Sequence, residues 1–251
     1  MKKFILFAIF IFSITVHSQR TIHVFVALCD NVNQGIVPVP KNLGNGQNPR
    51  TNLYWGALYG VKTHFKRSKD WTYIKSLKSN NSKILERVLF KHKTSNTYLL
   101  ADAYDGEFIK NTTIDFLEAT AGNNSEMIKH NNIDLNFGGN SNLLSYVGHD
   151  GLMEFNVKGN FKPKNKIKRD AIILACISKD YFKQYLKTTK ANPLVWTTGL
   201  MAPEAYTLKW AIDGWIKKES DLQIRERAAK AYNHYQKCGL QGAKRLLVTG
   251  F

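Results

Sequence analysis

The chain is poor in acidic side chains. Its 251 residues include 19 Asp and Glu against 36 Lys and Arg, a formal charge of +17. Such an excess attracts anionic partners, such as nucleic acid, lipopolysaccharide or acidic polysaccharide, through a long-range field, but it does not define a site. An anionic surface ligand is therefore one expected class of partner. The densest basic run, residues 158–169, is interpreted as a solvated loop.

Motifs typical of a cofactor are also lacking. The sequence has no Cys or His spacing typical of zinc, no Gly-rich phosphate loop and no Gly-x-Ser-x-Gly elbow. Asp102 and Asp105 lie near the end of an expected strand without a third ligand at calcium-loop spacing, which favours a turn. We expect neither a cofactor nor a metal.

Long hydrophobic runs are rare. One apolar run, Phe4 to Val16, follows Lys2 and Lys3 and precedes Ser18, an arrangement typical of a secretory signal. A membrane anchor is the alternative, but the run is shorter than the roughly 20 residues that a spanning helix needs. We therefore predict a signal peptide over residues 1–18, export to the periplasm or the medium, and a single domain over 19–251 with no transmembrane segment. Without Lys2 and Lys3, 34 basic residues face 19 acidic ones, leaving +15.

Cysteine is scarce as well. The three cysteines are Cys29, Cys176 and Cys238, and in an oxidising compartment an odd number leaves at least one thiol over. One interpretation pairs Cys29 with Cys238, because the first strand and the last helix of such a domain can pack together, and leaves Cys176 free. The alternative is three buried free thiols.

Apolar runs and amphipathic stretches alternate along most of the sequence. This alternation predicts an α/β fold with a mostly parallel sheet and helices on both faces. The expected strands cover 22–28, 86–92, 97–103, 143–148, 170–175 and 193–198, and the segment 123–142 is interpreted as a loop with one short strand or turn. The expected helices cover 53–64 capped by Asn52, 112–121 closed by Gly122, a segment capped by Ser178, a segment after Pro203, and 222–237.

Two of these strands end in side chains suited to nucleophilic chemistry. The strand from Leu143 leads into Gly148-His149-Asp150-Gly151, and the strand from Asp170 leads into Ala175-Cys176. Because the carboxyl ends of parallel strands meet at one edge, His149 and Cys176 are expected to be neighbours there. An imidazole can take the proton that a thiol loses when it attacks a carbonyl. The helix that Ser178 is expected to cap should lower the pKa of the thiol, because the thiol lies just before the positive end of that helix.

This pattern resembles the caspase-like cysteine peptidases, which include caspases, legumains, gingipains, clostripains and separases. The segment from Val195 to Tyr206, with Thr197-Thr198-Gly199, looks like the strand and Thr-Thr segment that follows the catalytic Cys of legumains. The resemblance implies a three-layer caspase-like sandwich and cleavage of a peptide or protein substrate. The sequence departs from the family at Asp150, since Gly usually follows the His directly.

The resemblance also assigns roles to particular positions. His149 and Cys176 would be catalytic, with Asn31 assisting the His, and the oxyanion would be held by backbone N–H groups of Cys176 and Gly151. The substrate side chain would be bound by Asp30, Thr197, Thr198 and Gly199.

Each of these residues also has an ordinary structural interpretation. A Cys in an apolar strand is usually a small buried hydrophobe, and an Asn at a strand end usually makes a turn. A second hypothesis is therefore an exported α/β binding protein without catalytic activity, whose basic surface meets anionic ligands. Whether His149 and Cys176 share an open cleft would distinguish the two.

Overall fold

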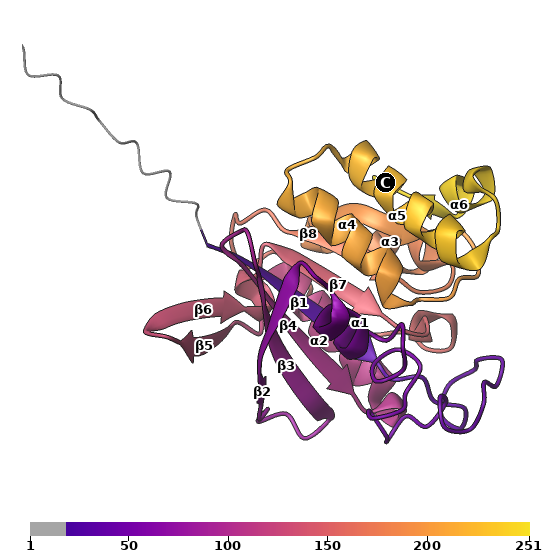
Figure 1. The fold of residues 1–251 in the computed structure, drawn as a ribbon, viewed down its shortest axis with the longest axis horizontal. Coiled ribbons are helices and arrows are strands. Elements are labelled where there is room, and N and C mark those ends of the chain that lie inside the picture. Colours follow the sequence, from indigo (N-terminus) through magenta and orange to yellow (C-terminus); the bar gives the residue numbers. More distant parts are fainter. Residues whose placement is uncertain (1–18) are drawn as a thin grey trace, which may run out of the picture.

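The computed structural model describes residues 19–251, so the predicted signal peptide lies outside the described residues. They form an α/β protein with a mixed, mostly parallel eight-stranded sheet, a two-stranded hairpin and six helices (Figure 1). The sheet strands are β1 (Arg20–Ala27), β2 (Trp71–Leu77), β3 (Ile84–His92), β4 (Thr97–Tyr104), β7 (Leu143–Val147), β8 (Asp170–Leu174), β9 (Asn192–Thr197) and β10 (Leu247–Val248). The hairpin is β5 (Glu126–His130) and β6 (Ile133–Phe137), and the helices are α1 (Val61–Arg67), α2 (Ile109–Ala121), α3 (Ser178–Thr189), α4 (Ala205–Ile216), α5 (Asp221–Gln236) and α6 (Leu240–Leu246).

The centre of the sheet is parallel and its edges are antiparallel. The strand order is β10-β9-β8-β7-β1-β4-β3-β2. Strands β4, β1, β7, β8 and β9 run parallel to one another, whereas β2, β3 and β10 are antiparallel to their neighbours. The parallel strands therefore direct their carboxyl ends to one common edge, where loops can form a site.

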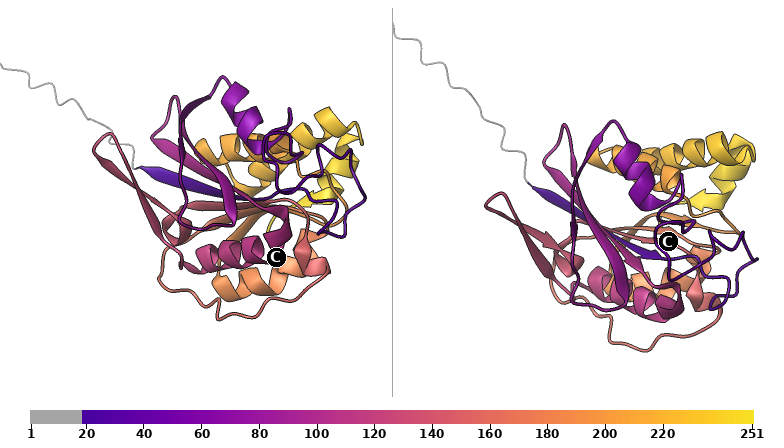
Figure 2. Two further views of the ribbon diagram at one scale, coloured as in Figure 1. Left: turned by 90° about the horizontal axis from the view of Figure 1, so that it is seen from below. Right: turned by 60° about the horizontal axis from the view of Figure 1, so that its bottom comes forward.

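Helices cover both faces of the sheet. Figure 2 shows α1, α4, α5 and α6 on one face and α2 and α3 on the other. Side chains along β1 point alternately to the two faces of the sheet. Val24 and Val26 pack in the core under α1, α4 and α5, and Phe25 and Ala27 pack in the core under α2 and α3. Both faces are buried, which explains why the central strands are almost continuously apolar.

The predicted alternation of strands and helices is confirmed for most of the chain, with local differences. The helix expected over 53–64 is in fact a series of turns followed by α1, which begins only at Val61. Ser178 does not cap α3 but is its first residue, and Ile177 precedes it in a left-handed conformation with φ +50°. The helix that ends at Ala121 stops as predicted at Gly122, whose φ of +93° suits glycine.

Strands β2 and β10 were not predicted, and the hairpin of β5 and β6 was expected only as a loop with one short strand or turn. Strands β2 and β10 are the edge strands of the main sheet. Edge strands carry polar residues on their exposed side, which weakens the alternation of β2, and β10 has only two residues. The hairpin projects from the body of the molecule in Figure 1.

Candidate active site at the ends of β7 and β8

Strands β7 and β8 bring His149 and Cys176 to the same edge of the sheet. The two strands pair in parallel, with Val147 opposite Leu174. The N–H of Gly148 continues the pairing by donating to the carbonyl of Leu174 at 3.2 Å. His149 and Cys176 each lie two residues beyond the last paired position. Neighbouring strands were predicted to bring both residues to one edge of the sheet, and the backbone confirms this. The edge at the carboxyl ends of β7 and β8 is named the rim.

Cys176 is half-buried in the turn between β8 and α3. Its Sγ donates to the carbonyl of Met201 at 3.6 Å and accepts the N–H of Met201 at 3.4 Å. Burial raises the pKa of the thiol, the hydrogen bond from Met201 opposes this change, and the nearby Asp150 carboxylate raises the pKa further. The net effect is opposite to the predicted lowering. The first N–H of α3, at Ser178, donates instead to Oγ1 of Thr197 at 3.1 Å.

His149 is 7% exposed and is held by an acid that the sequence did not suggest. Its Nε2 lies 2.5 Å from Oε1 of Glu154. The same Glu154 oxygen accepts the N–H of Gly35 at 2.6 Å. The hydroxyl of Tyr146 donates to the carbonyl of His149 at 2.8 Å. The imidazole is therefore fixed through one ring nitrogen, which leaves Nδ1 as the nitrogen available for other chemistry.

Asn31 does not have the role that the family resemblance implied. Its Oδ1 accepts the N–H of Val39 at 3.0 Å and its Nδ2 donates to the carbonyl of Val39 at 2.7 Å. The amide is thus engaged in closing the loop after β1, and the group that contacts the His is Glu154. The sequence clue was weak: an acid five residues after His149, in a segment with no regular periodicity.

Asp150, where the family usually has Gly, is completely buried. Its Oδ1 accepts the N–H of Leu152 at 3.0 Å and so caps the short 3-10 turn Gly151–Met153. Among the described residues, no group donates a hydrogen bond to its Oδ2. Burial raises the pKa of Asp150 to about 7, with the Leu152 N–H opposing the change and Glu154 adding to it. A carboxyl that titrates near neutrality therefore lies close to the candidate nucleophile.

Gly151 begins the turn that Asp150 caps. A Cβ at this position would lie 2.4 Å from the ring of Phe155, so a larger residue would displace that ring. Its carbonyl accepts the N–H groups of Glu154 and Phe155. Donation to an oxyanion by the N–H groups of Gly151 and Cys176 stays a prediction.

Asp30 has a structural task that uses all of its acceptor capacity. Oδ1 accepts the N–H groups of Val32 and Asn33, and Oδ2 accepts the side-chain amides of Asn33 and Gln47, at 2.9 to 3.1 Å. Burial acts to raise the pKa of Asp30, but these hydrogen bonds outweigh it and the pKa is lowered. With four bonds accepted and 1% of its surface exposed, Asp30 shapes the loop rather than offering a carboxylate to a substrate.

Asn52, expected as a helix cap, joins two parts of this loop. Its Oδ1 accepts the N–H groups of Cys29 and Tyr54, and its Nδ2 donates to the carbonyls of Cys29 and Asn45. The side chain is completely buried. The long polar segment after β1 is therefore an ordered loop beside the rim, fixed by the buried amide of Asn52.

Thr197, Thr198 and Gly199 lie next to the turn that carries Cys176. Thr197 is buried and its Oγ1 donates to the carbonyl of Ala175. The carbonyl of Gly199 accepts the N–H of Ile177 at 2.9 Å. Thr198 is exposed, and its hydroxyl donates to the carbonyl of Arg245 at 2.7 Å. Thr197 and Gly199 therefore hold the turn in place, and Thr198 is the most exposed of the three.

The three cysteines are free thiols in the structure, so the predicted pair of Cys29 and Cys238 is not formed. Cys29 is completely buried at the end of β1, whereas Cys238 is exposed after α5. Burial raises the pKa of Cys29 to about 11, with a hydrogen bond from Tyr54 opposing it and Asp30 adding to it. Cys29 is therefore an inert core thiol, and the alternative of three buried thiols holds for Cys29 alone.

No family model, curated protein or solved structure matches this chain.

Residues 19–251 show neither a metal-binding cluster nor a membrane-spanning helix. Nowhere in this range do three or more His, Cys, Asp or Glu side chains gather as they would to hold a metal ion. No helix of the same range is long and apolar enough to cross a membrane.

Proposed function

We propose that this protein is an exported cysteine peptidase of caspase-like fold, which cleaves peptide bonds through His149 and Cys176. The observation that carries the proposal is the register of β7 and β8, together with the imidazole held by Glu154 at that rim. A sheet with a parallel centre and helices on both faces supports the caspase-like assignment. The short apolar run at residues 4–16 supports export.

The chemistry begins with Cys176 as a thiol rather than a thiolate, because burial raises its pKa. As a substrate carbonyl approaches, Nδ1 of His149 takes the thiol proton and Sγ forms a bond to the carbonyl carbon. The imidazolium then gives this proton to the leaving amine, which departs and leaves a thioester on Cys176. Water, losing a proton to His149, attacks the thioester and releases the acid, and the proton returns to the sulfur.

Glu154 acts on the reaction through His149. Its carboxylate accepts the Nε2–H, which keeps the lone pair on Nδ1 and stabilises the imidazolium that forms during the reaction. The same oxygen binds the Gly35 N–H, so the loop after β1 fixes the carboxylate in turn. Glu154 is a positioning residue, in the place that the resemblance gave to Asn31.

Thiol labelling tests the proposal on the chain from residue 19 to 251. The exposed Cys238 is first changed to Ser, since it would label in any case, while the buried Cys29 should not react. In this background Cys176→Ala should abolish labelling by a thiol-directed peptide probe. His149→Ala should slow labelling and hydrolysis of a fluorogenic peptide by roughly 10²–10⁴-fold, the usual contribution of an acid–base group.

Glu154→Gln sharpens the test. It should lower the rate less than His149→Ala and shift the acidic limb of the pH profile, because a neutral amide stabilises the imidazolium less well. Glu107→Gln, at an exposed acid in the 3-10 turn after β4, is the matched control and should change nothing. Equal labelling of Cys176 with and without His149, with no hydrolysis of any peptide, would overturn the proposal.

The second candidate is an exported binding protein that has no catalytic activity. It is favoured by one observation, the raised pKa of Cys176 beside the buried Asp150. Under this hypothesis the Asp150→Gly variant, which restores the residue usual in the family, should gain neither labelling nor hydrolysis.

A further inference from the structure

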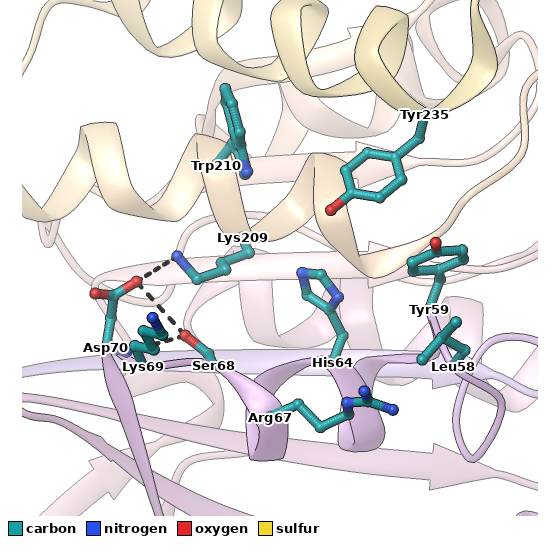
Figure 3. A pocket seen from close by; sticks show the side chains of 10 residues that line it. All are labelled: Leu58, Tyr59, His64, Arg67, Ser68, Lys69, Asp70, Lys209, Trp210 and Tyr235. Carbon is teal, nitrogen blue, oxygen red and sulfur yellow. Dashed lines mark hydrogen bonds and ion pairs between the residues drawn. The ribbon is translucent and has the colours of Figure 1, made fainter.

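A pocket of about 560 Å³ lies away from the sheet rim, between α1, the loop after it, α4 and α5 (Figure 3). Its walls come from parts of the chain that are far apart in sequence. One side is aromatic and the other is charged. The lining residues are Leu58, Tyr59, His64, Arg67, Ser68, Lys69, Asp70, Lys209, Trp210 and Tyr235.

The aromatic side is rigid. Tyr235 stacks on Tyr206 with 4.1 Å between ring centroids and 12° between the planes. Tyr59 meets Tyr235 edge to face at 5.1 Å. Trp210 projects from α4 towards the same space in Figure 3. Rings that are already fixed can bind a flat apolar surface with little loss of side-chain entropy.

The charged side offers both cations and an acceptor. Lys209 is held by Asp70 at 2.6 Å and by Asp213 at 2.8 Å, so its charge is compensated within the protein. Arg67 and Lys69, in contrast, form no ion pair among the described residues. The Asp70 side chain is 52% exposed and keeps acceptor capacity towards the pocket. An anionic group would meet Arg67 and Lys69, and a hydroxyl would meet Asp70 and Ser68.

His64 adds a neutral polar group. Burial lowers its pKa to about 4, and the nearby Lys209 and Arg67 lower it further. At neutral pH the imidazole therefore carries no charge and presents one donor and one acceptor.

A second pocket of about 560 Å³ begins on the far side of Trp210. It is lined by Trp210 together with Lys230, Asn233, His234, Lys237, Gly239 and Leu240. Trp210 thus stands between two spaces, each with cationic side chains. A ligand that extends across Trp210 would place one ring on the indole and negative groups on both sides.

We propose that these adjoining pockets bind an acidic oligosaccharide across Trp210. Such a ligand offers an apolar ring face to Trp210, hydroxyl groups to Asp70 and Ser68, and carboxylates or sulfates to the lysines and Arg67. A single-stranded nucleic acid would find aromatic rings and cations here as well, but its successive bases would need successive stacking rings, whereas Trp210 is the residue that lines both pockets. The proposal does not depend on activity at Cys176.

Isothermal titration of residues 19–251 tests this site with three probes: a uronic-acid hexasaccharide, a sulfated hexasaccharide and a neutral glucose hexasaccharide. At least one acidic probe should bind, and the neutral one should bind at least tenfold more weakly. Trp210→Ala should weaken the acidic probe at least tenfold. The double variant Arg67→Gln/Lys69→Gln should weaken it severalfold and reduce the dependence of Kd on salt.

Matched variants on the opposite face separate a site from general attraction to a basic protein. Tyr181→Ala removes an exposed aromatic ring of α3, and Lys166→Gln/Lys187→Gln removes two exposed charges. These variants and Cys176→Ala should leave Kd unchanged. The proposal would be overturned if both double variants lost the same affinity for the acidic probe, if Trp210→Ala had no effect, or if neither acidic probe bound. It would also be overturned if a twelve-nucleotide oligothymidylate bound more tightly and displaced the saccharide.

Discussion

The rim at the ends of β7 and β8 and the pocket beside Trp210 are built in opposite ways. At the rim, Asp30, Asn31 and Asn52 are engaged by the protein's own hydrogen bonds. In the pocket, Arg67 and Lys69 form no ion pair within residues 19–251, and Asp70, although paired with Lys209, is half exposed. The rim is thus preorganised by the chain, whereas the pocket leaves its charges to be met by a ligand.

Asp150 is the exception at the rim. Its buried Oδ2 has no donor among residues 19–251, so an ionised carboxylate there lacks the compensation that Asp30 receives. Two acids of the same rim therefore have pKa values shifted in opposite directions, lowered at Asp30 and raised at Asp150. The contrast shows that hydrogen bonds, rather than depth alone, decide the charge state.

The largest expected effect concerns Asp150, whose pKa is shifted in the direction opposite to that of Asp30. A pKa of about 7 in the folded state, against 3.8 ordinarily, means that folding favours the protonated form. The contribution of Asp150 to the free energy of unfolding is therefore complete below pH 4. Roughly 4 kcal/mol of this contribution is lost as the pH rises to 7 and above. Asp150→Asn keeps the cap without a charge and should flatten this fall, making the variant the more stable protein at pH 8. Urea unfolding at pH 5 and pH 8 checks this, and parallel curves for the two proteins would refute it.

The next effect concerns the ordered loop after β1. Asn52→Ala leaves the buried N–H groups of Cys29 and Tyr54 and the buried carbonyl of Cys29 without their partner. We expect the free energy of unfolding to fall by about 3 kcal/mol, since each unsatisfied buried group costs about 1–3 kcal/mol. Asn48→Ala, which removes one exposed bond to Arg50, is the control and should change stability by only a few tenths of a kcal/mol. Similar losses in both variants would mean that the loop is not held by its buried amide.

The sequence could predict the strands that are buried on both faces of the sheet, but not the contacts that irregular turns make. The apolar runs of β1, β7, β8 and β9 predicted the centre of the sheet, because strands buried on both faces have little choice of residue. The adjacency of His149 and Cys176 followed from two short blocks within 30 residues. By contrast, Glu154 contacts His149 through the path of an irregular turn, which no periodicity describes.

The pocket beside Trp210 was beyond sequence reasoning for a related reason. Its aromatic and basic residues are scattered over 58–70, 209–210 and 230–237, so the linear sequence shows no interleaving of the two types. Only the packing of α1 against α4, and of α4 against α5, brings them together. The pKa of Cys176 was misjudged for a similar reason, because the burial of the thiol, the main cause of its raised pKa, depends on how the turn after β8 packs beside Met201.

The smallest expected effect tests whether the pocket charges serve the fold. Lys209 lowers the pKa of Asp70 mainly through their hydrogen bond, so the pair stabilises the folded state above pH 4 and loses this contribution as the pH falls. Because Asp70 is half exposed, solvent screens the pair, and Asp70→Asn should reduce the free energy of unfolding by less than about 1 kcal/mol. Raising the salt concentration from 0.05 to about 1 M should shrink the difference, because the Debye length falls to about 3 Å. A loss as large as that of Asn52→Ala in urea unfolding would show that Asp70 is part of the framework, and the distinction between a preorganised rim and a pocket that awaits its ligand would no longer hold.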